Sequence, residues 1–300
     1  MNLKLLAIAV AAAATPFAAQ AEFTVGGDVG IGYFQHSDGE TFFGGHGSEV
    51  TFDANQKIGG LTYFGHFEVN VAGATVDDQS NVEDDDGDVA GTLTQAGSLR
   101  SDDMFIGVKG AFGEVRLGDT DNGCDAVDTG WVADDEYISH SSGGCKSSDQ
   151  NNITYKGSRG PVSYAASWSP DVDNGAAVSG EDVFAVGVKG KMGPATVSLG
   201  YESDSSVGDN VVLGVSGNFG PIALGVRLND GDNDTDVGYT AQYAAGSNKF
   251  YIGVGDDSDV DSLFLGYQRK IGSRTTFIAE WVEDDNETDD QVGIGFKHAF

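Results

Sequence analysis

The sequence is poor in basic residues, proline and cysteine, and it has no long apolar run beyond its N-terminus. Lysine and arginine together number 16 against 47 aspartate and glutamate residues, which gives a formal net charge of −31. Such a surface repels nucleic acid, so we expect no nucleic-acid partner. No later segment approaches ~20 consecutive apolar residues, which argues against a transmembrane helix.

The N-terminus has the pattern of a secretory signal peptide. Lys4 precedes a short apolar run at 5–14, and Ala19-Gln-Ala21 fits a small-residue cleavage site. The alternative, a membrane anchor, is less consistent with so short a run. We therefore predict that residues 1–21 are removed on export and that residues 22–300 form the mature domain.

Glycine, in contrast, is abundant, with 45 residues. Each glycine inside a helix costs ~1 kcal/mol relative to alanine, so a helical fold is disfavoured. From residue 22 onward, apolar residues alternate with small or polar ones, which is the period of a β-strand. In the first such segment Phe23, Val25, Val29, Ile31 and Tyr33 share one face. The pattern predicts about 16 strands, joined alternately by tight turns and by long acidic segments.

This asymmetry between the two ends is typical of an all-β, antiparallel transmembrane β-barrel of the outer membrane. A water-soluble β-sandwich or propeller is the alternative, but the small and polar second face suits a water-filled lumen better than a dry core. Aromatic residues near the strand ends fit interfacial girdles. They are Tyr33, Phe34, Phe112, Tyr155, Trp168, Tyr201, Phe219, Phe250, Tyr251, Trp281 and Phe300.

A hairpin and a long loop stand out in the middle of the chain. Residues 104–118 alternate as an apolar hairpin about the turn 110–113, and parity places Arg116 with Glu114 on the lumen face. Residues 119–149 follow with little periodicity, and a loop this long is usually functional. The loop holds both cysteines, Cys124 and Cys145. In an exported chain this favours a disulfide between them, with two free thiols as the alternative.

The mature chain as a whole resembles the general diffusion porins of Gram-negative bacteria. The signal peptide, the hairpin Phe-Ile-Gly-Val-Lys-Gly-Ala-Phe-Gly-Glu-Val-Arg-Leu-Gly at 105–118, the long third loop and the terminal Phe300 carry the resemblance. It implies a sixteen-stranded barrel whose third loop folds into the lumen and narrows the pore, with acidic loop residues facing basic wall residues. It also implies a homotrimer embedded in outer-membrane lipid and lipopolysaccharide.

The resemblance leads to a candidate constriction. We expect it to combine loop aspartates with basic wall residues, namely Asp119, Asp121, Asp125 and Asp128 with Arg116 and Lys156. The chain departs from the family by having Asp119 where arginine is frequent and Asp102-Asp103 where a basic residue is frequent, and His298 replaces an aromatic. A net negative constriction attracts cations, so we predict cation preference. Solvated loop charge, or adaptation to salt, is the alternative.

Two acidic runs have the closely spaced carboxylates that Ca²⁺ prefers. They contain Asp84, Asp86 and Asp88 in one run and Asp230, Asp232 and Asp234 in the other. Neither is an EF-hand, since the second lacks the glycine and the bidentate glutamate that such a loop needs. We expect at most weak Ca²⁺ binding and no other cofactor, with solvated loops as the alternative.

The sequence therefore predicts a passive channel in the outer membrane for ions and small hydrophilic solutes. A structural or adhesive surface barrel, whose acidic loops bind divalent cations, is the alternative. A barrel hydrolase is a third candidate, but no nucleophile elbow or phosphate loop occurs, so we do not expect an enzyme.

Overall fold

The computed structural model describes residues 21–36, 41–44, 48–71, 82–83, 89–90, 99–133, 144–145, 151–170, 182–204, 208–231, 235–257, 260–284 and 291–300. Within these ranges, no helix is long and apolar enough to span a bilayer. The predicted signal peptide lies outside them, apart from Ala21 at the start of the first strand.

The described chain is almost entirely β-structure. The long strands are β1 Ala21–His36, β3 Glu49–Ile58, β4 Leu61–Val71, β7 Leu99–Gly110, β8 Gly113–Asp119, β9 Asn151–Arg159, β10 Val162–Ser169, β11 Val183–Met192, β12 Ala195–Asp204, β13 Gly208–Phe219, β14 Ile222–Gly231, β15 Thr235–Ala245, β16 Asn248–Asp257, β17 Val260–Lys270, β18 Thr275–Asp284 and β19 Gln291–Ala299. The short elements are β2 Thr41–Gly44, β5 Val82–Glu83, β6 Val89–Ala90 and the 3₁₀ helix η1 Asp125–Val127.

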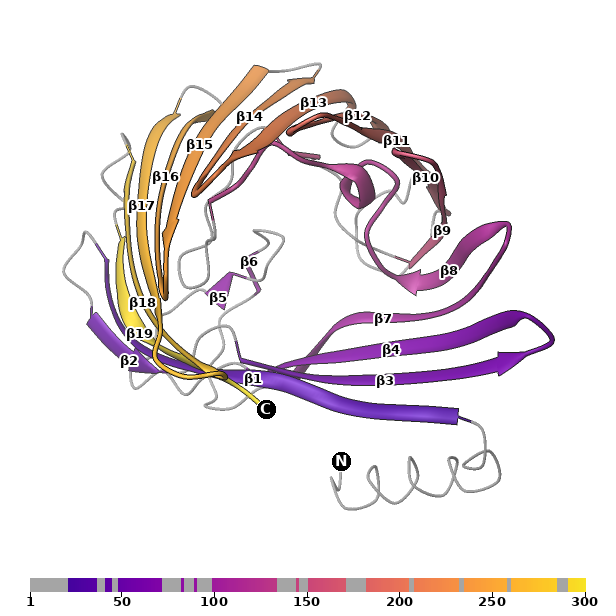
Figure 1. The fold of residues 1–300 in the computed structure, drawn as a ribbon, viewed down its shortest axis with the longest axis horizontal. Coiled ribbons are helices and arrows are strands. Elements are labelled where there is room, and N and C mark those ends of the chain that lie inside the picture. Colours follow the sequence, from indigo (N-terminus) through magenta and orange to yellow (C-terminus); the bar gives the residue numbers. More distant parts are fainter. Residues whose placement is uncertain are drawn as a thin grey trace.

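These strands form a closed antiparallel barrel (Figure 1). The first strand closes it because it pairs at both of its edges. Its residues 21–28 run against 56–49 of β3, and its residues 28–36 run against 299–291 of β19. Apart from the four-residue β2, the sheet consists of sixteen long strands, which confirms the predicted architecture.

Three short strands were not predicted from the sequence. β2 lies between β1 and β3 in the sequence and pairs with residues 32–35 of β1. β5 and β6 pair only with each other, within the acidic segment between β4 and β7. Elements of two to four residues contain too little alternation to be recognised by period.

Side chains are distributed in the opposite way from a water-soluble protein. Apolar residues on the outer face are exposed, for example Ile106 at 64% and Leu199 at 48%, whereas the inward-facing Phe264 is fully buried. An outer face of this kind suits hydrocarbon, because lipid is as apolar as the side chains that face it. The sequence-based assignment of aromatic residues to the interfacial girdles is wrong for two of them. Phe34 and Tyr251 are each only 4% exposed and lie on the inner face.

Several tight turns depend on glycine. Gly160, Gly193, Gly220 and Gly246 have φ values between 61° and 66°, in the left-handed region that other residues rarely adopt. Three of them precede a proline in the sequence. These turns define one end of the barrel, which we call the short-turn rim. In bacterial outer-membrane barrels the short turns lie on the periplasmic side.

The segment after β8 does not continue the wall. Figure 1 shows residues 120–133 inside the ring of strands, along the inner surface of β9 to β14. Contacts with those strands, described below, hold it there. This confirms the expectation that the third long connection folds into the lumen.

Candidate pore constriction

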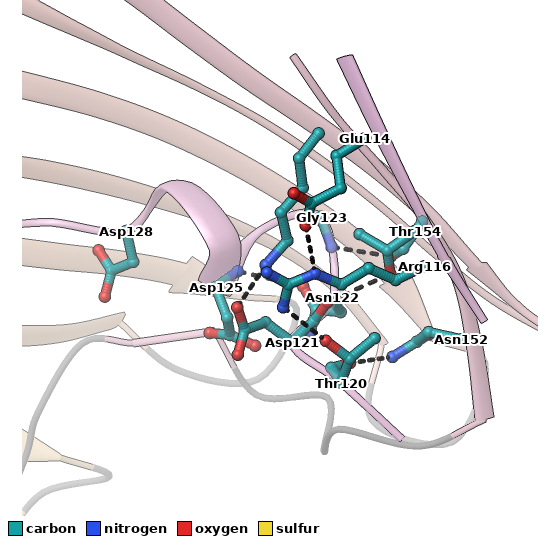
Figure 2. Close-up of polar contacts among 12 residues, drawn as sticks. Glu114, Arg116, Thr120, Asp121, Asn122, Gly123, Asp125, Asp128, Asn152 and Thr154 are labelled. Carbon is teal, nitrogen blue, oxygen red and sulfur yellow. Dashed lines mark hydrogen bonds and ion pairs between the residues drawn. The ribbon is translucent and has the colours of Figure 1, made fainter. Parts of the chain in front are cut away.

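Arg116 extends from β8 along the lumen wall, as its parity predicts (Figure 2). Its Nε donates to Glu114 Oε1 at 2.6 Å, and its Nη1 donates to Thr120 Oγ1 at 3.2 Å. The guanidinium carbon lies 4.5 Å from the centre of the Phe105 ring, within reach of a cation–π interaction. The charge of Arg116 is therefore partly balanced by a carboxylate on its own strand.

The first part of the loop is bonded to the wall through its backbone. Asn152 Nδ2 donates to the Thr120 carbonyl at 2.8 Å, and Thr154 Oγ1 donates to the Asp121 carbonyl at 3.2 Å. The Gly123 amide donates to Ser167 Oγ at 2.8 Å. Inward-facing polar residues of β9 and β10 thus supply the partners that a loop lying against a strand face would otherwise lack.

Lys156 and Asp121, both predicted constriction residues, form an ion pair. Lys156 Nζ lies 2.5 Å from Asp121 Oδ2, and the two side chains are 21% and 43% exposed. Figure 2 shows Asp121 close to Asp125, at the start of η1. The structure therefore brings together two of the predicted acidic residues and one predicted wall cation at the same part of the wall.

The predicted disulfide between Cys124 and Cys145 is present, with a Cα–Cα distance of 6.1 Å. Asn122 holds the backbone next to this disulfide, since Asn122 Oδ1 accepts from the amides of Cys124 at 2.7 Å and Asp125 at 3.2 Å. These bonds satisfy donors at the start of η1. The other arm of the loop is bonded as well, because Asn229 Nδ2 donates to the Gly144 carbonyl at 2.7 Å.

Asp128 is paired with a wall residue that the sequence did not single out. Arg227 Nη1 donates to Asp128 Oδ2 at 2.7 Å, and the guanidinium lies 5.5 Å from the Trp131 ring centre. Lys189 Nζ is 3.5 Å from the Asp128 carbonyl oxygen. Both basic residues lie on the inward parity of their strands, which is the sequence signal that could have identified them. The wall therefore has more positive charge near the loop than Arg116 and Lys156 provide.

The loop lies close to the wall because the strands beneath it have glycine at the points of approach. A methyl group at Gly214 would overlap the Thr129 carbonyl oxygen, and one at Gly225 would overlap the Gly130 carbonyl oxygen. The same holds for Gly187 against Val127. Small inward residues on successive strands thus form a shallow seat, and larger side chains there would push the loop into the lumen.

The first described stretch of the loop, which ends at Ala133, reaches an apolar cluster on the inner wall. Ala133 packs with Tyr251, Phe264 and Val282, and Trp131 contacts the same cluster. Thr240 bonds the loop backbone nearby, since its Oγ1 accepts from the Val132 amide and donates to the Gly130 carbonyl. Tyr251 therefore supports the loop instead of an interfacial girdle.

The remaining predicted site residues divide into two groups. Asp119 is the last residue of β8, in register with Met104 and Asn151, where the chain leaves the wall. Asp125 opens η1. Asp230 accepts a hydrogen bond from Thr235 Oγ1 at 3.0 Å. The other five proposed calcium ligands, Asp84, Asp86, Asp88, Asp232 and Asp234, lie outside the described residues.

One group of possible metal ligands occurs in the described part of the chain, Cys124, Cys145 and Glu202. The disulfide removes both thiolates as ligands, since a metal binds the deprotonated sulfur. Glu202 is fully buried and accepts a hydrogen bond from Asn210 Nδ2 at 2.7 Å. This group therefore does not fit a metal centre.

Comparisons with known proteins agree with this geometry. The family model described as "Gram-negative porin" matches residues 6–289. The chain is similar to the outer-membrane protein OmpT of Vibrio cholerae, solved in a trimer form, with a TM-score of 0.69 and 18% identity over 94% of this chain and all of that one. No curated protein sequence matches significantly.

Two further solved structures have the same fold. An anion-selective porin from Comamonas acidovorans gives a TM-score of 0.62 at 19% identity, over 94% of this chain and all of that one. A mutant of the Rh. blastica porin gives 0.67 at 14% identity, over 93% of this chain and all of that one.

Proposed function

The chain belongs to the Gram-negative porin family of the outer membrane, and on that premise we propose that it is a cation-preferring diffusion channel. It would pass ions and small hydrophilic solutes down their gradients. The observation that carries this proposal is the loop after β8, which is bonded along the inner wall of the barrel and contains Asp121, Asp125 and Asp128. A passive channel of this kind needs no catalytic group.

The proposed cation preference rests on the charges around the loop. Asp121 is balanced by Lys156 and Asp128 by Arg227, so these pairs contribute less field than four unpaired aspartates would. Asp125 adds a further negative charge beside Asp121. Charges in a narrow pore interact more strongly than in bulk water, where a pair at 4 Å is worth ~1 kcal/mol. Lys189, close to Asp128, offsets part of the negative charge, so only a modest preference for K⁺ over Cl⁻ is expected.

The aspartates differ in their expected effect on ion selectivity. By the alternation of β8, Asp119 shares the parity of Leu117, whose side chain is 46% exposed on the outer face. We therefore expect Asp119 to influence selectivity less than Asp121. Replacing Asp121 also frees the charge of Lys156, which would shift the passage further toward anions.

Planar-bilayer recording tests the proposal. The wild type should conduct, and its zero-current potential in a KCl gradient should favour K⁺, with a preference that shrinks as salt is raised. Asp121→Asn should reduce the preference more than Asp119→Asn, and Asp234→Asn, in the connection between β14 and β15, serves as the charge-matched control. Absence of conductance would favour a structural or adhesive barrel. A wild type that prefers Cl⁻ would overturn the proposed role of the aspartates.

The partners follow from the same proposal. We propose a homotrimer, as described for the Vibrio cholerae protein, embedded in outer-membrane lipid and lipopolysaccharide. Weak Ca²⁺ binding by the acidic connections remains part of this proposal. Cross-linking in mild detergent, followed by denaturing electrophoresis, should yield a product of three chains, and a product of one chain would contradict the trimer.

A further inference from the structure

In the part of the chain that the structure describes, the lysines of the wall are collected at one end of the barrel. On the first strands, Lys57, Lys109 and Lys156 are linked by the cross-strand register, since Lys57 pairs with Thr62, Thr62 with Lys109, Lys109 with Glu114, and Glu114 with Lys156. Lys57 and Lys109 lie within three residues of a tight turn. This row therefore follows the short-turn rim across β3, β7 and β9.

Further lysines extend the row in both directions. On β11, Lys189 and Lys191 precede the turn at Gly193. Near the C-terminus, Lys270 pairs with Thr276, and Thr276 pairs with Lys297. Lys249, the second residue of β16, completes the set, which we call the rim lysines.

The rim lysines face the lumen. Lys156 and Lys189 reach the loop inside the barrel, and Lys109 Nζ lies 5.2 Å from the ring centre of the inward-facing Phe64. Lys297 Nζ is 3.3 Å from Asp28 Oδ2. Lys57, Lys191 and Lys270 share the inward parity of their strands and are exposed. Arg159 and Arg269 sit at the same rim but on the outward parity.

The opposite end of the lumen has the opposite sign. On the inward parity, Glu68, Glu202, Asp236 and Glu280 lie on the halves of their strands that are farther from the short turns, the last three of them buried, whereas Glu114 lies beside a short turn. The connections at that end contain the acidic runs of the sequence, such as 83–88 and 230–236. A solute that crosses the barrel therefore passes an acidic half, the loop, and then a basic rim.

We propose that the rim lysines form a basic vestibule that binds polyvalent anions and, in series with the acidic half, makes the pore conduct asymmetrically. This rests on the proposed channel function. Clefts lined by charge of one sign concentrate counter-ions. When the applied potential is positive on the acidic side, cations enter through the acidic half and anions enter through the basic rim. Both kinds of ion then accumulate in the pore, and its conductance rises. When the voltage is reversed, each ion enters through the end whose charge has the same sign and is repelled there. The pore is then depleted of ions, and its conductance falls.

The test is single-channel recording in 0.1 M KCl with the orientation of each barrel known. A biotinylated tag between Asp284 and Gln291, in a connection opposite the short turns, reports orientation through streptavidin added to one side. The current should be larger, by about a factor of two, when the tagged side is positive, and the asymmetry should fade at 1 M KCl, where the screening length is about 3 Å. Sodium tripolyphosphate should block at lower concentration from the short-turn side.

Matched variants assign the effect to the lumen. Lys57→Gln/Lys191→Gln/Lys270→Gln should abolish the asymmetry and weaken the tripolyphosphate block at least tenfold. Arg159→Gln/Arg269→Gln/Arg274→Gln removes the same charge from outward or turn positions at the same rim and should leave both nearly unchanged. A conducting but symmetric wild type, or equal effects of the two triple variants, would overturn the basic vestibule while leaving the channel intact. A barrel that does not conduct would instead overturn the proposed function.

Discussion

At the scale of single residues, the loop inside the barrel is held by a few charged and polar side chains. Arg227 is one of these, because it pairs with Asp128 and lies over the Trp131 ring. Its side chain is only 9% exposed, and that of Asp128 is 15% exposed. Removing one partner of such a pair is costly because the other charge remains buried.

Arg227→Gln should therefore loosen the loop by roughly 3 kcal/mol and make the open-channel current noisier. Adding Asp128→Asn to this variant should restore part of the loss, since no uncompensated charge then remains. The measurement is the low-frequency noise of single channels for both variants and the wild type. If Arg227→Gln is as quiet as the wild type, the pair does not hold the loop.

Gly214 should not tolerate a side chain, although it sits on an ordinary strand. The methyl of Gly214→Ala would meet the Thr129 carbonyl oxygen, so the loop must shift, at a cost of about 1–3 kcal/mol. We expect altered conductance with an unchanged far-ultraviolet circular dichroism spectrum. Gly190→Ala is the control, because the nearest atom to its added methyl is Val162 Cγ2 at 3.9 Å. Equal conductance in the two variants would contradict the claim that the loop needs glycine at position 214 to lie close to the wall.

At the scale of elements, the strands were predictable and the path of the loop was only partly so. The strands repeat a two-residue period, and one face must be apolar throughout, so each strand is determined locally. The loop has no such period. Its docking depends on Ser167, Thr240 and Arg227, which lie tens of residues away in the sequence. Phe34 and Tyr251 were misassigned for a different reason, since aromatic type alone does not tell inward from outward, whereas the parity of the exposed Tyr33 and Phe250 does.

The disulfide is the covalent part of this element. Closing a loop of ~20 residues stabilises it by roughly 3 kcal/mol in the loop-entropy model. Cys124→Ser/Cys145→Ser should therefore leave the barrel folded but increase current noise. Adding reductant to wild-type channels should act slowly, because Cys124 is only 1% exposed. Mass mapping of exported protein that finds both thiols free would rule out this role.

At the scale of the whole molecule, charge is arranged along the barrel axis instead of being scattered. The wall places its lysines at the short-turn rim, while the sequence concentrates aspartate in the connections at the other end. Loss of Lys4 with the signal peptide would change the net charge from −31 to −32. Charge of one sign at this density destabilises a compact state through self-repulsion.

Salt should therefore stabilise this barrel. Raising NaCl from 0.05 to 1 M shortens the screening length several-fold, and we expect the temperature of unfolding in detergent to rise by on the order of 5 °C. The measurement is the loss of the circular dichroism signal of β-structure on heating. Ca²⁺ at matched ionic strength separates screening from specific binding, since additional stabilisation by Ca²⁺ would indicate that the acidic connections hold the ion. An unfolding temperature that is independent of salt would show that the acidic segments do not strain the folded barrel.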